Sequence, residues 1–171
     1  MEKCNLIVDV GCENSPYLPS LSKKARVAIV LDNSRLLCKM VSDEGYPVVP
    51  ADASCLPFKN GSVDVICASE VIVHLPTLGI FVEFERVCRR IVATVANSRS
   101  PHFKLGPTHI FRYTIRSLKR LLGTRKNRTY VIKGIGCHHV PLPGWTKCLS
   151  TGLTWFFPSL SPTIAIIGEI R

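Results

Sequence analysis

The sequence predicts an α/β fold in which helices cover both faces of a mostly parallel β-sheet. Three observations indicate this class. The first hundred residues alternate apolar, β-rich runs with amphipathic or loop segments, which is typical of a parallel sheet covered by helices. The runs are nearly continuous Val, Ile and Ala, as expected for strands that are buried on both faces. A chain of 171 residues, 46% of them hydrophobic, suits a single domain over residues 1–171 and excludes a mainly disordered protein.

The expected elements follow one another in a regular order. In the first part of the chain they are strands at Asn5–Val10, Arg26–Leu31, Pro47–Val49 and Val63–Cys67, a helix at Leu78–Arg89 and a strand at Ile91–Ala96. Residues 98–109 are rich in Ser, Pro, His and Gly, which predicts a loop.

The second part of the chain continues with one helix and two strands. We expect Thr114 to cap a helix over Ile115–Leu122, whose apolar residues fall on one face and which Gly123 ends. Strands at Tyr130–Ile135 and Thr163–Ile170 follow, and an irregular segment with Pro, Gly and Trp separates them at residues 140–161.

The net charge of +10 is distributed unevenly. Residues 1–100 hold 11 basic and 11 acidic side chains, whereas residues 101–171 hold 11 basic side chains and a single acid, Glu169. A uniformly basic protein is therefore excluded. We divide the predicted domain into an electroneutral half, residues 1–97, and a basic half, residues 98–171.

The terminal and most apolar segments favour a cytoplasmic protein without a membrane span. The first residues have neither the apolar length nor the cleavage site of a signal peptide. The most apolar stretch, residues 153–168, is interrupted by Pro158 and Pro162 and is too short to cross a bilayer.

The eight cysteines show no C-x-x-C spacing, which argues against a zinc or redox motif. We expect most of them to be small buried hydrophobic residues. Cys137, His138 and His139 are consecutive, so on an extended strand their side chains point to opposite faces and do not converge on one ion. No metal site is predicted.

Acidic residues stand at the ends of successive predicted strands. Asp9 ends the first strand and is followed by Gly11, where a tight turn allows a close approach of the backbone to a ligand. Asp32 ends the second strand, roughly twenty residues after the turn at Gly11. At this spacing in the sequence a carboxylate can accept both hydroxyls of a ribose. Asp52 follows the third strand, and Ser69-Glu70 follows the fourth. Aspartates that merely cap turns are common, but three in register favour a site for a nucleoside-type ligand.

These segments together resemble the class I S-adenosylmethionine-dependent methyltransferases. The resemblance rests on Leu6-Ile7-Val8-Asp9-Val10-Gly11-Cys12, on the segment Ala51-Asp52-Ala53-Ser54-Cys55-Leu56-Pro57-Phe58 and on the other strand ends, and it covers residues 5–97. It implies a Rossmann-like sheet of the seven-stranded type whose last strand is antiparallel, with the N-terminal helices of the family truncated. It also implies S-adenosyl-L-methionine as cofactor.

The resemblance implies a role for each matched residue. Asp9 and Gly11 would lie beside the methionine part of the cofactor, and Cys12 would also belong to the cofactor site. Asp32 would hold the ribose hydroxyls, and Asn33 would also belong to the cofactor site. Asp52, with Ala53, would contact the adenine amino group. Ser69 and Glu70 would border the methyl-transfer site.

Methyl transfer from a sulfonium requires mainly alignment of the nucleophile and the methyl group, so a base is optional. The candidates for a base are Glu70, His74 and His109, which we expect near the carboxyl edge of the sheet. Alternatively each of the three is a locally hydrogen-bonded or solvated residue.

The basic half bears on the acceptor of the methyl group. Basic side chains interleaved with aromatic ones can engage phosphates and stack on bases, and the expected nucleic-acid contacts are Arg116, Lys119, Arg120, Arg125, Lys126 and Arg128. An anionic lipid surface and a merely solvated helix face are the competing interpretations.

Two functions from different classes remain open. The first is a methyltransferase whose acceptor is RNA or a small anionic molecule. The second is a non-catalytic, methyltransferase-like binding subunit that acts with a partner protein or nucleic acid. For either function, a partner chain or a homodimer is possible. The second interpretation rests on Glu13, which stands in the loop where the family usually has further glycines, and on the early start of the first strand.

Overall fold

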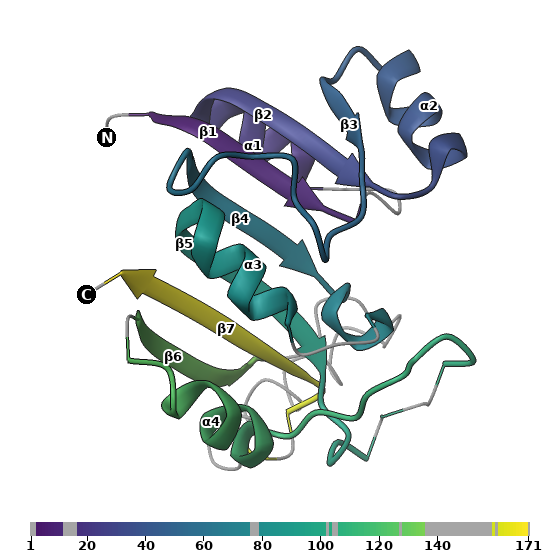
Figure 1. Ribbon diagram of the computed structural model, residues 1–171. Helices are drawn as coiled ribbons and strands as arrows, with labels where there is room; N and C mark the ends of the chain where they lie inside the picture. Colours follow the sequence, from purple (N-terminus) through teal and green to yellow (C-terminus); the bar gives the residue numbers. More distant parts are fainter. Residues whose placement is uncertain are drawn as a thin grey trace.

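A seven-stranded β-sheet runs through the middle of the molecule, with helices on both of its faces (Figure 1). The computed structural model describes residues 3–11, 17–75, 79–101, 103, 106–126, 128–135, 159 and 161–170. Its strands are β1 (Cys4–Val10), β2 (Ala25–Asp32), β3 (Val48–Pro50), β4 (Val63–Ser69), β5 (Cys88–Ala96), β6 (Arg128–Ile135) and β7 (Thr163–Ile170).

The strands lie in the order β3-β2-β1-β4-β5-β7-β6. Neighbouring strands from β3 to β5 are parallel, whereas β7 is antiparallel to both β5 and β6. This confirms the predicted Rossmann-like sheet with an antiparallel last strand. The carboxyl ends of β1, β2 and β4 meet at one edge, which is where open α/β sheets bind ligands.

The helices are α1 (Leu18–Lys24), α2 (Arg35–Asp43), the 3₁₀-helix η1 (Ile72–His74), α3 (Ile80–Val87) and α4 (Ile115–Gly123). Successive residues of a strand face opposite sides of the sheet, and β2 shows the result. Val30 packs with Leu18 of α1 and Val41 of α2. Leu31 belongs to a second core cluster, which also holds Phe81 and Phe84 of α3. Figure 1 accordingly shows α3 and α4 in front of the sheet and α1 behind it.

The predicted helix at Leu78–Arg89 is wrong at its C-terminal end. The helix ends at Val87, and Cys88 and Arg89 already belong to β5. Cys88 has an extended backbone and pairs with Val63 of β4. The helix passes directly into the strand without a turn. The sequence therefore has no Gly, Pro or Asn there that would indicate where the helix ends. Leu78 lies outside the described residues.

The predicted cap of α4 is confirmed. Thr114 Oγ1 accepts a hydrogen bond from the backbone N–H of Ser117 at 3.0 Å, and the Thr114 N–H donates to Ser117 Oγ at 2.9 Å. This reciprocal pairing satisfies donors that would otherwise lack partners in the first turn. The helix extends through Gly123, one residue beyond the prediction.

Some predictions fall on other parts of the chain. Cys12, Glu13, the Cys137-His138-His139 run and the segment 140–161 apart from Ser159 and Ser161 lie outside the described residues. Among the described cysteines, Cys38 and Cys88 are buried, Cys55 is exposed, and none forms a disulfide. In the described ranges no helix is long and apolar enough to cross a membrane.

Candidate functional site

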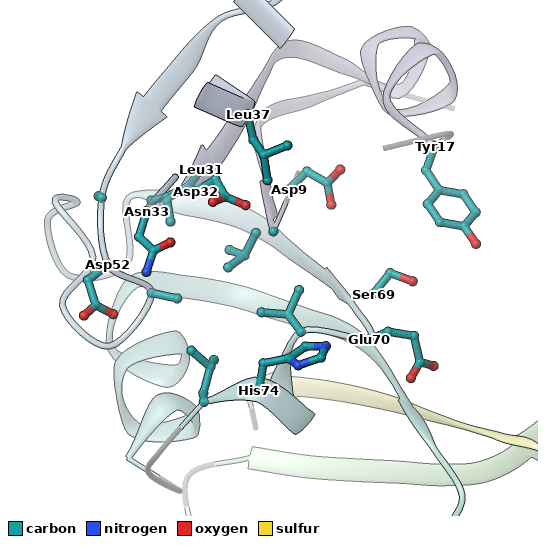
Figure 2. Close-up of a pocket in the computed structure, with 16 residues that line it drawn as sticks. Asp9, Tyr17, Leu31, Asp32, Asn33, Leu37, Asp52, Ser69, Glu70 and His74 are labelled. Carbon is teal, nitrogen blue, oxygen red and sulfur yellow. The ribbon is translucent and has the colours of Figure 1, made fainter. Parts of the chain in front are cut away.

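A cavity of about 680 Å³ opens at the carboxyl edge of β1, β2 and β4 (Figure 2). Its volume lies in the range of roughly 300–1,000 Å³ that is common for small-molecule sites. Nine of the predicted site residues line it: Asp9, Gly11, Asp32, Asn33, Asp52, Ala53, Ser69, Glu70 and His74. The structure therefore brings most of the predicted site together.

The end of β1 forms the middle of the cavity. Asp9 is only 4% exposed, and its backbone lies between Val30 of β2 and Cys67 of β4. Gly11 follows with φ +84° and donates its N–H to Leu31 O at 2.8 Å. A Cβ atom at Gly11 would lie 2.2 Å from Cγ2 of Val71. Both the left-handed backbone and this close approach require glycine.

Asp32 ends β2 in a local hydrogen-bond arrangement. Its Oδ1 accepts the N–H of Ser34 at 2.7 Å, and Ser34 in turn caps α2 by accepting the N–H of Leu37 at 3.4 Å. The backbone carbonyl of Asp32 also accepts the N–H of Ala51 at 2.9 Å. The start of α2 and the chain after β3 thus hold Asp32 in place from two sides.

Asp52 stands in the loop after β3. Its Oδ1 accepts the N–H and the hydroxyl of Ser54, both at 2.7 Å. The backbone hydrogen bond, followed by the hydroxyl bond, lowers the pKa of Asp52 below its ordinary value, so the carboxylate is ionised at neutral pH. The neighbouring Ala53 is buried.

The end of β4 is strained at Glu70. Glu70 has φ +58° and is the one non-glycine residue with positive φ in the described part of the chain. Its N–H donates to Thr94 O of β5 at 3.0 Å, and the hydroxyls of Ser69 and Thr94 lie 3.2 Å apart. A left-handed conformation at a residue other than glycine costs about 1–3 kcal/mol and is found preferentially at functional sites.

Two histidines meet beside the cavity. The ring centroids of His74 and His109 lie 5.0 Å apart in an edge-to-face arrangement, and His74 Nδ1 donates to Thr108 O at 3.1 Å. His74 lines the cavity, whereas His109 is not among the residues that line it. Desolvation, followed by the proximity of His74, lowers the pKa of His109. The imidazole of His109 is therefore neutral at pH 7.

The side chains lie in a row along the cavity. Figure 2 shows Asp52 at one end, then Asn33 and Asp32, then Asp9, with Ser69 and Glu70 toward the other end. Tyr17 stands at this far end, opposite Asp52. Sequence reasoning missed Tyr17 because no pattern connects a residue ahead of α1 with the end of β4.

The structure divides the predicted nucleic-acid contacts. Arg116, Lys119, Arg120 and Lys126 are exposed. Arg125 is half-buried and pairs with Glu85, with Nε and Oε1 2.5 Å apart.

Arg128 is wrong as a nucleic-acid contact, because it is only 3% exposed. Its guanidinium donates to the carbonyl oxygens of Arg89 at 2.7 Å and of Glu85 at 3.0 Å, and also to that of Cys88. Thr129, the next residue, pairs with Glu169 of β7, and Glu169 in turn pairs with Arg90 near the start of β5. Arg128 therefore stands at the edge of the sheet away from the cavity.

Comparisons with known proteins agree with this geometry. A family model described as a methyltransferase domain matches residues 8–92. No curated protein matches the sequence. Many solved structures share the fold. An S-adenosylmethionine-dependent methyltransferase from Archaeoglobus fulgidus has a TM-score of 0.70 at 18% identity, over 97% of this chain and 86% of that one.

Two further structures extend the comparison. A putative methyltransferase from Haloferax volcanii, solved in a complex with the Trm112 methyltransferase activator, has a TM-score of 0.77 at 15% identity, over 100% of this chain and 84% of that one. Phosphoethanolamine N-methyltransferase 1 from Haemonchus contortus, solved with phosphoethanolamine and S-adenosylhomocysteine, has a TM-score of 0.71 at 14% identity, over 99% of this chain and 40% of that one. At these identities the likeness is one of fold.

Proposed function

Because this chain has a methyltransferase domain of the class I, Rossmann-like type, we propose that it transfers a methyl group from S-adenosylmethionine to an acceptor. S-adenosylmethionine is the cofactor that the domain and its structural neighbours support. The observation that carries the proposal is the row of Asp52, Asp32 and Asp9 along one cavity (Figure 2). An elongated ligand with an amino group, a diol and an ammonium group presents its donors to carboxylates in such a row.

The cavity divides accordingly into three parts. Asp52 and Ala53 would hold the adenine, and the ionised Asp52 is a suitable acceptor for an exocyclic amino group. Asp32, with Asn33, would accept the ribose hydroxyls. Its attachment to Ser34 and Ala51 supports this role, because the carboxylate is oriented before the ligand arrives.

The methionine part would lie at the turn after β1. Asp9 would face its ammonium group, and Gly11 lets the backbone approach without a side chain in the way. We assign Cys12 to the same part, on the resemblance alone. When bound, the cofactor supplies an electrophilic methyl group on a positively charged sulfur.

The acceptor would enter at Ser69 and Glu70. The backbone strain at Glu70 supports a functional role for this end of the cavity. Glu70, His74 and His109 are the candidates for taking a proton from the acceptor.

Among these candidates, His109 is neutral at pH 7 and so can accept a proton. With its pKa lowered, activity should persist below the ordinary histidine pKa and fall only as His109 becomes protonated. A pH–rate profile checks this: a His109→Gln variant that keeps the wild-type acidic limb would exclude His109 as the base.

The test of the proposed function is a calorimetric titration with S-adenosylhomocysteine. We expect the wild-type chain to bind and Asp32→Asn to weaken the binding by about 10- to 100-fold, since charged hydrogen bonds contribute about 1.5–3 kcal/mol. Asp43→Asn is the matched control, because Asp43 is exposed at the end of α2. This control should leave the affinity unchanged.

A chain that binds no cofactor at millimolar concentration would contradict the enzyme and favour the alternative, a methyltransferase-like binding subunit. The Haloferax neighbour, which was solved with an activator protein, supports including a partner chain in that case. Gel filtration of the free chain separates a homodimer from a subunit that needs another protein.

The acceptor is proposed to be anionic, either RNA or a small anionic molecule. The exposed cations Arg116, Lys119, Arg120 and Lys126 support this, as does the surplus of positive charge in residues 98–171. Thr114 and Tyr113 precede α4, and Tyr113 pairs with Asn97 just after β5. The first turn of α4 thus begins close to the carboxyl edge of the sheet, where the cavity opens.

A further inference from the structure

Two charged side chains of α3 hold the loop between β3 and β4, residues 51–62. Glu83 Oε1 accepts the backbone N–H of Leu56 at 2.7 Å. The guanidinium of Arg86 donates to Leu56 O at 3.0 Å and to Phe58 O at 2.9 Å. Together the two side chains satisfy backbone groups that the loop, which lacks regular structure, does not satisfy itself.

The same two residues are bonded to each other and to the end of the loop. Arg86 Nε lies 2.8 Å from Glu83 Oε2, and its second terminal nitrogen lies 2.5 Å from Oε1. Arg86 also donates to Asn60 Oδ1 at 2.8 Å, and its carbonyl oxygen accepts the N–H of Gly61 at 2.9 Å. A planar guanidinium with five donors suits this number of acceptors, which an ammonium group could not reach at once.

The loop held in this way carries the adenine end of the proposed cofactor site. Asp52 and Ala53 line the cavity, and Leu56 is buried three residues after Ala53. Glu83 and Arg86 do not line the cavity, so they act on it only through the loop. On the other side, the Ala51 N–H bond to Asp32 O is the connection to β2.

We propose that Glu83 and Arg86 are positioning residues for recognition of the adenine base, because they fix the loop that presents Asp52. This inference rests on the proposed function. It assigns to α3 a role in cofactor specificity, in addition to its packing on the sheet. Glu83 accepts the N–H of Leu56 with the same carboxylate that orients Arg86, so the pair works as a unit.

The experiment compares two ligands that differ in one group of the base. S-adenosylhomocysteine has an exocyclic amino group, and S-inosylhomocysteine has a carbonyl oxygen there. The wild-type chain should prefer the first, since Asp52 accepts from the amino group but not from the carbonyl. Asp52→Asn should reduce this preference and serves as the reference for its loss.

Arg86→Met should weaken binding of S-adenosylhomocysteine by about tenfold or more and bring the ratio of the two affinities close to that of Asp52→Asn. Arg86→Lys should restore only part of the preference for S-adenosylhomocysteine over S-inosylhomocysteine, because one ammonium group cannot replace the several donors of the guanidinium. Glu83→Gln keeps the shape and the acceptor oxygen, so it tests the pair in a folded chain if Arg86→Met unfolds. It should lower the ratio by weakening the bond to Arg86.

A cofactor-independent measurement accompanies the titrations. Amide hydrogen exchange at Leu56 and Gly61 in the ligand-free protein should accelerate in Arg86→Met and Glu83→Gln. Arg89→Met is the control, because the Arg89 side chain is exposed and lies 3.8 Å from its Asp64 partner. It should change neither the exchange nor the affinity ratio.

The outcomes separate the two proposals. Unchanged exchange and an unchanged ratio in Glu83→Gln and Arg86→Met overturn the positioning role and leave the proposed function standing. A loss of melting temperature with an unchanged ratio also overturns it, because the pair would then be only structural. A wild-type chain that binds neither ligand at millimolar concentration overturns the proposed function, and the positioning role with it.

Discussion

Gly11→Ala is expected to lower the free energy of unfolding by about 2–4 kcal/mol and to weaken cofactor binding in parallel. Two effects add. The backbone at φ +84° is unfavourable for any residue with a Cβ atom, and that atom would lie 2.2 Å from Cγ2 of Val71. Relief of the overlap requires Val71 to move, and Val71 lines the cavity next to Glu70. Urea denaturation and the titration with S-adenosylhomocysteine measure the two losses.

Two controls divide the effect at Gly11 into its parts. Gly61 has φ +65° with no atom within 4 Å of the position of a Cβ, so Gly61→Ala should show the backbone cost alone, about 1 kcal/mol. Val71→Ala combined with Gly11→Ala should recover the part due to overlap, which a double-mutant cycle measures as a coupling energy. No coupling between the two positions would contradict the contact.

The affinity of the chain for single-stranded RNA is expected to fall about 50-fold between 50 and 200 mM salt. This holds if four cations each neutralise one phosphate, because each phosphate contributes about 0.7 to the slope of log affinity against log salt concentration. The four are the exposed Arg116, Lys119, Arg120 and Lys126. They project from or follow α4, whose buried face is formed by Leu118 and Leu122. A filter-binding titration at several salt concentrations measures the slope.

Substitutions sharpen the RNA prediction. Arg116→Gln with Arg120→Gln should reduce the magnitude of the slope by about 1.4, the contribution of two phosphates. Lys39→Gln on the exposed side of α2 is the matched control and should leave it unchanged. Retention that is indifferent to salt would exclude phosphate contacts and leave a small anionic molecule as the acceptor.

The fold was predictable because its signals are local. Continuous apolar runs mark the strands, and an acid at the end of each of the first two marks the edge where they meet the ligand. The boundary between α3 and β5 was not predictable in the same way. Cys88 is both the C-cap of α3 and the first residue of β5, so no turn residue separates the two elements.

The candidate site was predictable where it depends on strand ends, but it was not predictable where it depends on contacts between residues far apart in the sequence. Val71 lies against Gly11 from sixty residues away in the chain, and Arg86 reaches Leu56 from thirty away. For Arg128 a signal did exist. Arg128 stands two residues before Tyr130 and four before the buried Ile132 in one strand, so the alternation of β6 already places it on the inner face.

The division of the chain at residue 97 describes its charge distribution and not its architecture, because α3 bonds to residues of both halves. On one side Glu83 and Arg86 form hydrogen bonds to the loop of residues 51–62, in the electroneutral half. On the other, Glu85 Oε1 accepts from Arg125 at 2.5 Å and from the Tyr130 hydroxyl at 2.6 Å, both in the basic half. Asn97 itself is fully buried and donates to Ser159 O at 2.9 Å and to Ser161 O at 2.6 Å. The two halves therefore share one interior, and neither has a complete set of hydrogen-bond partners without the other.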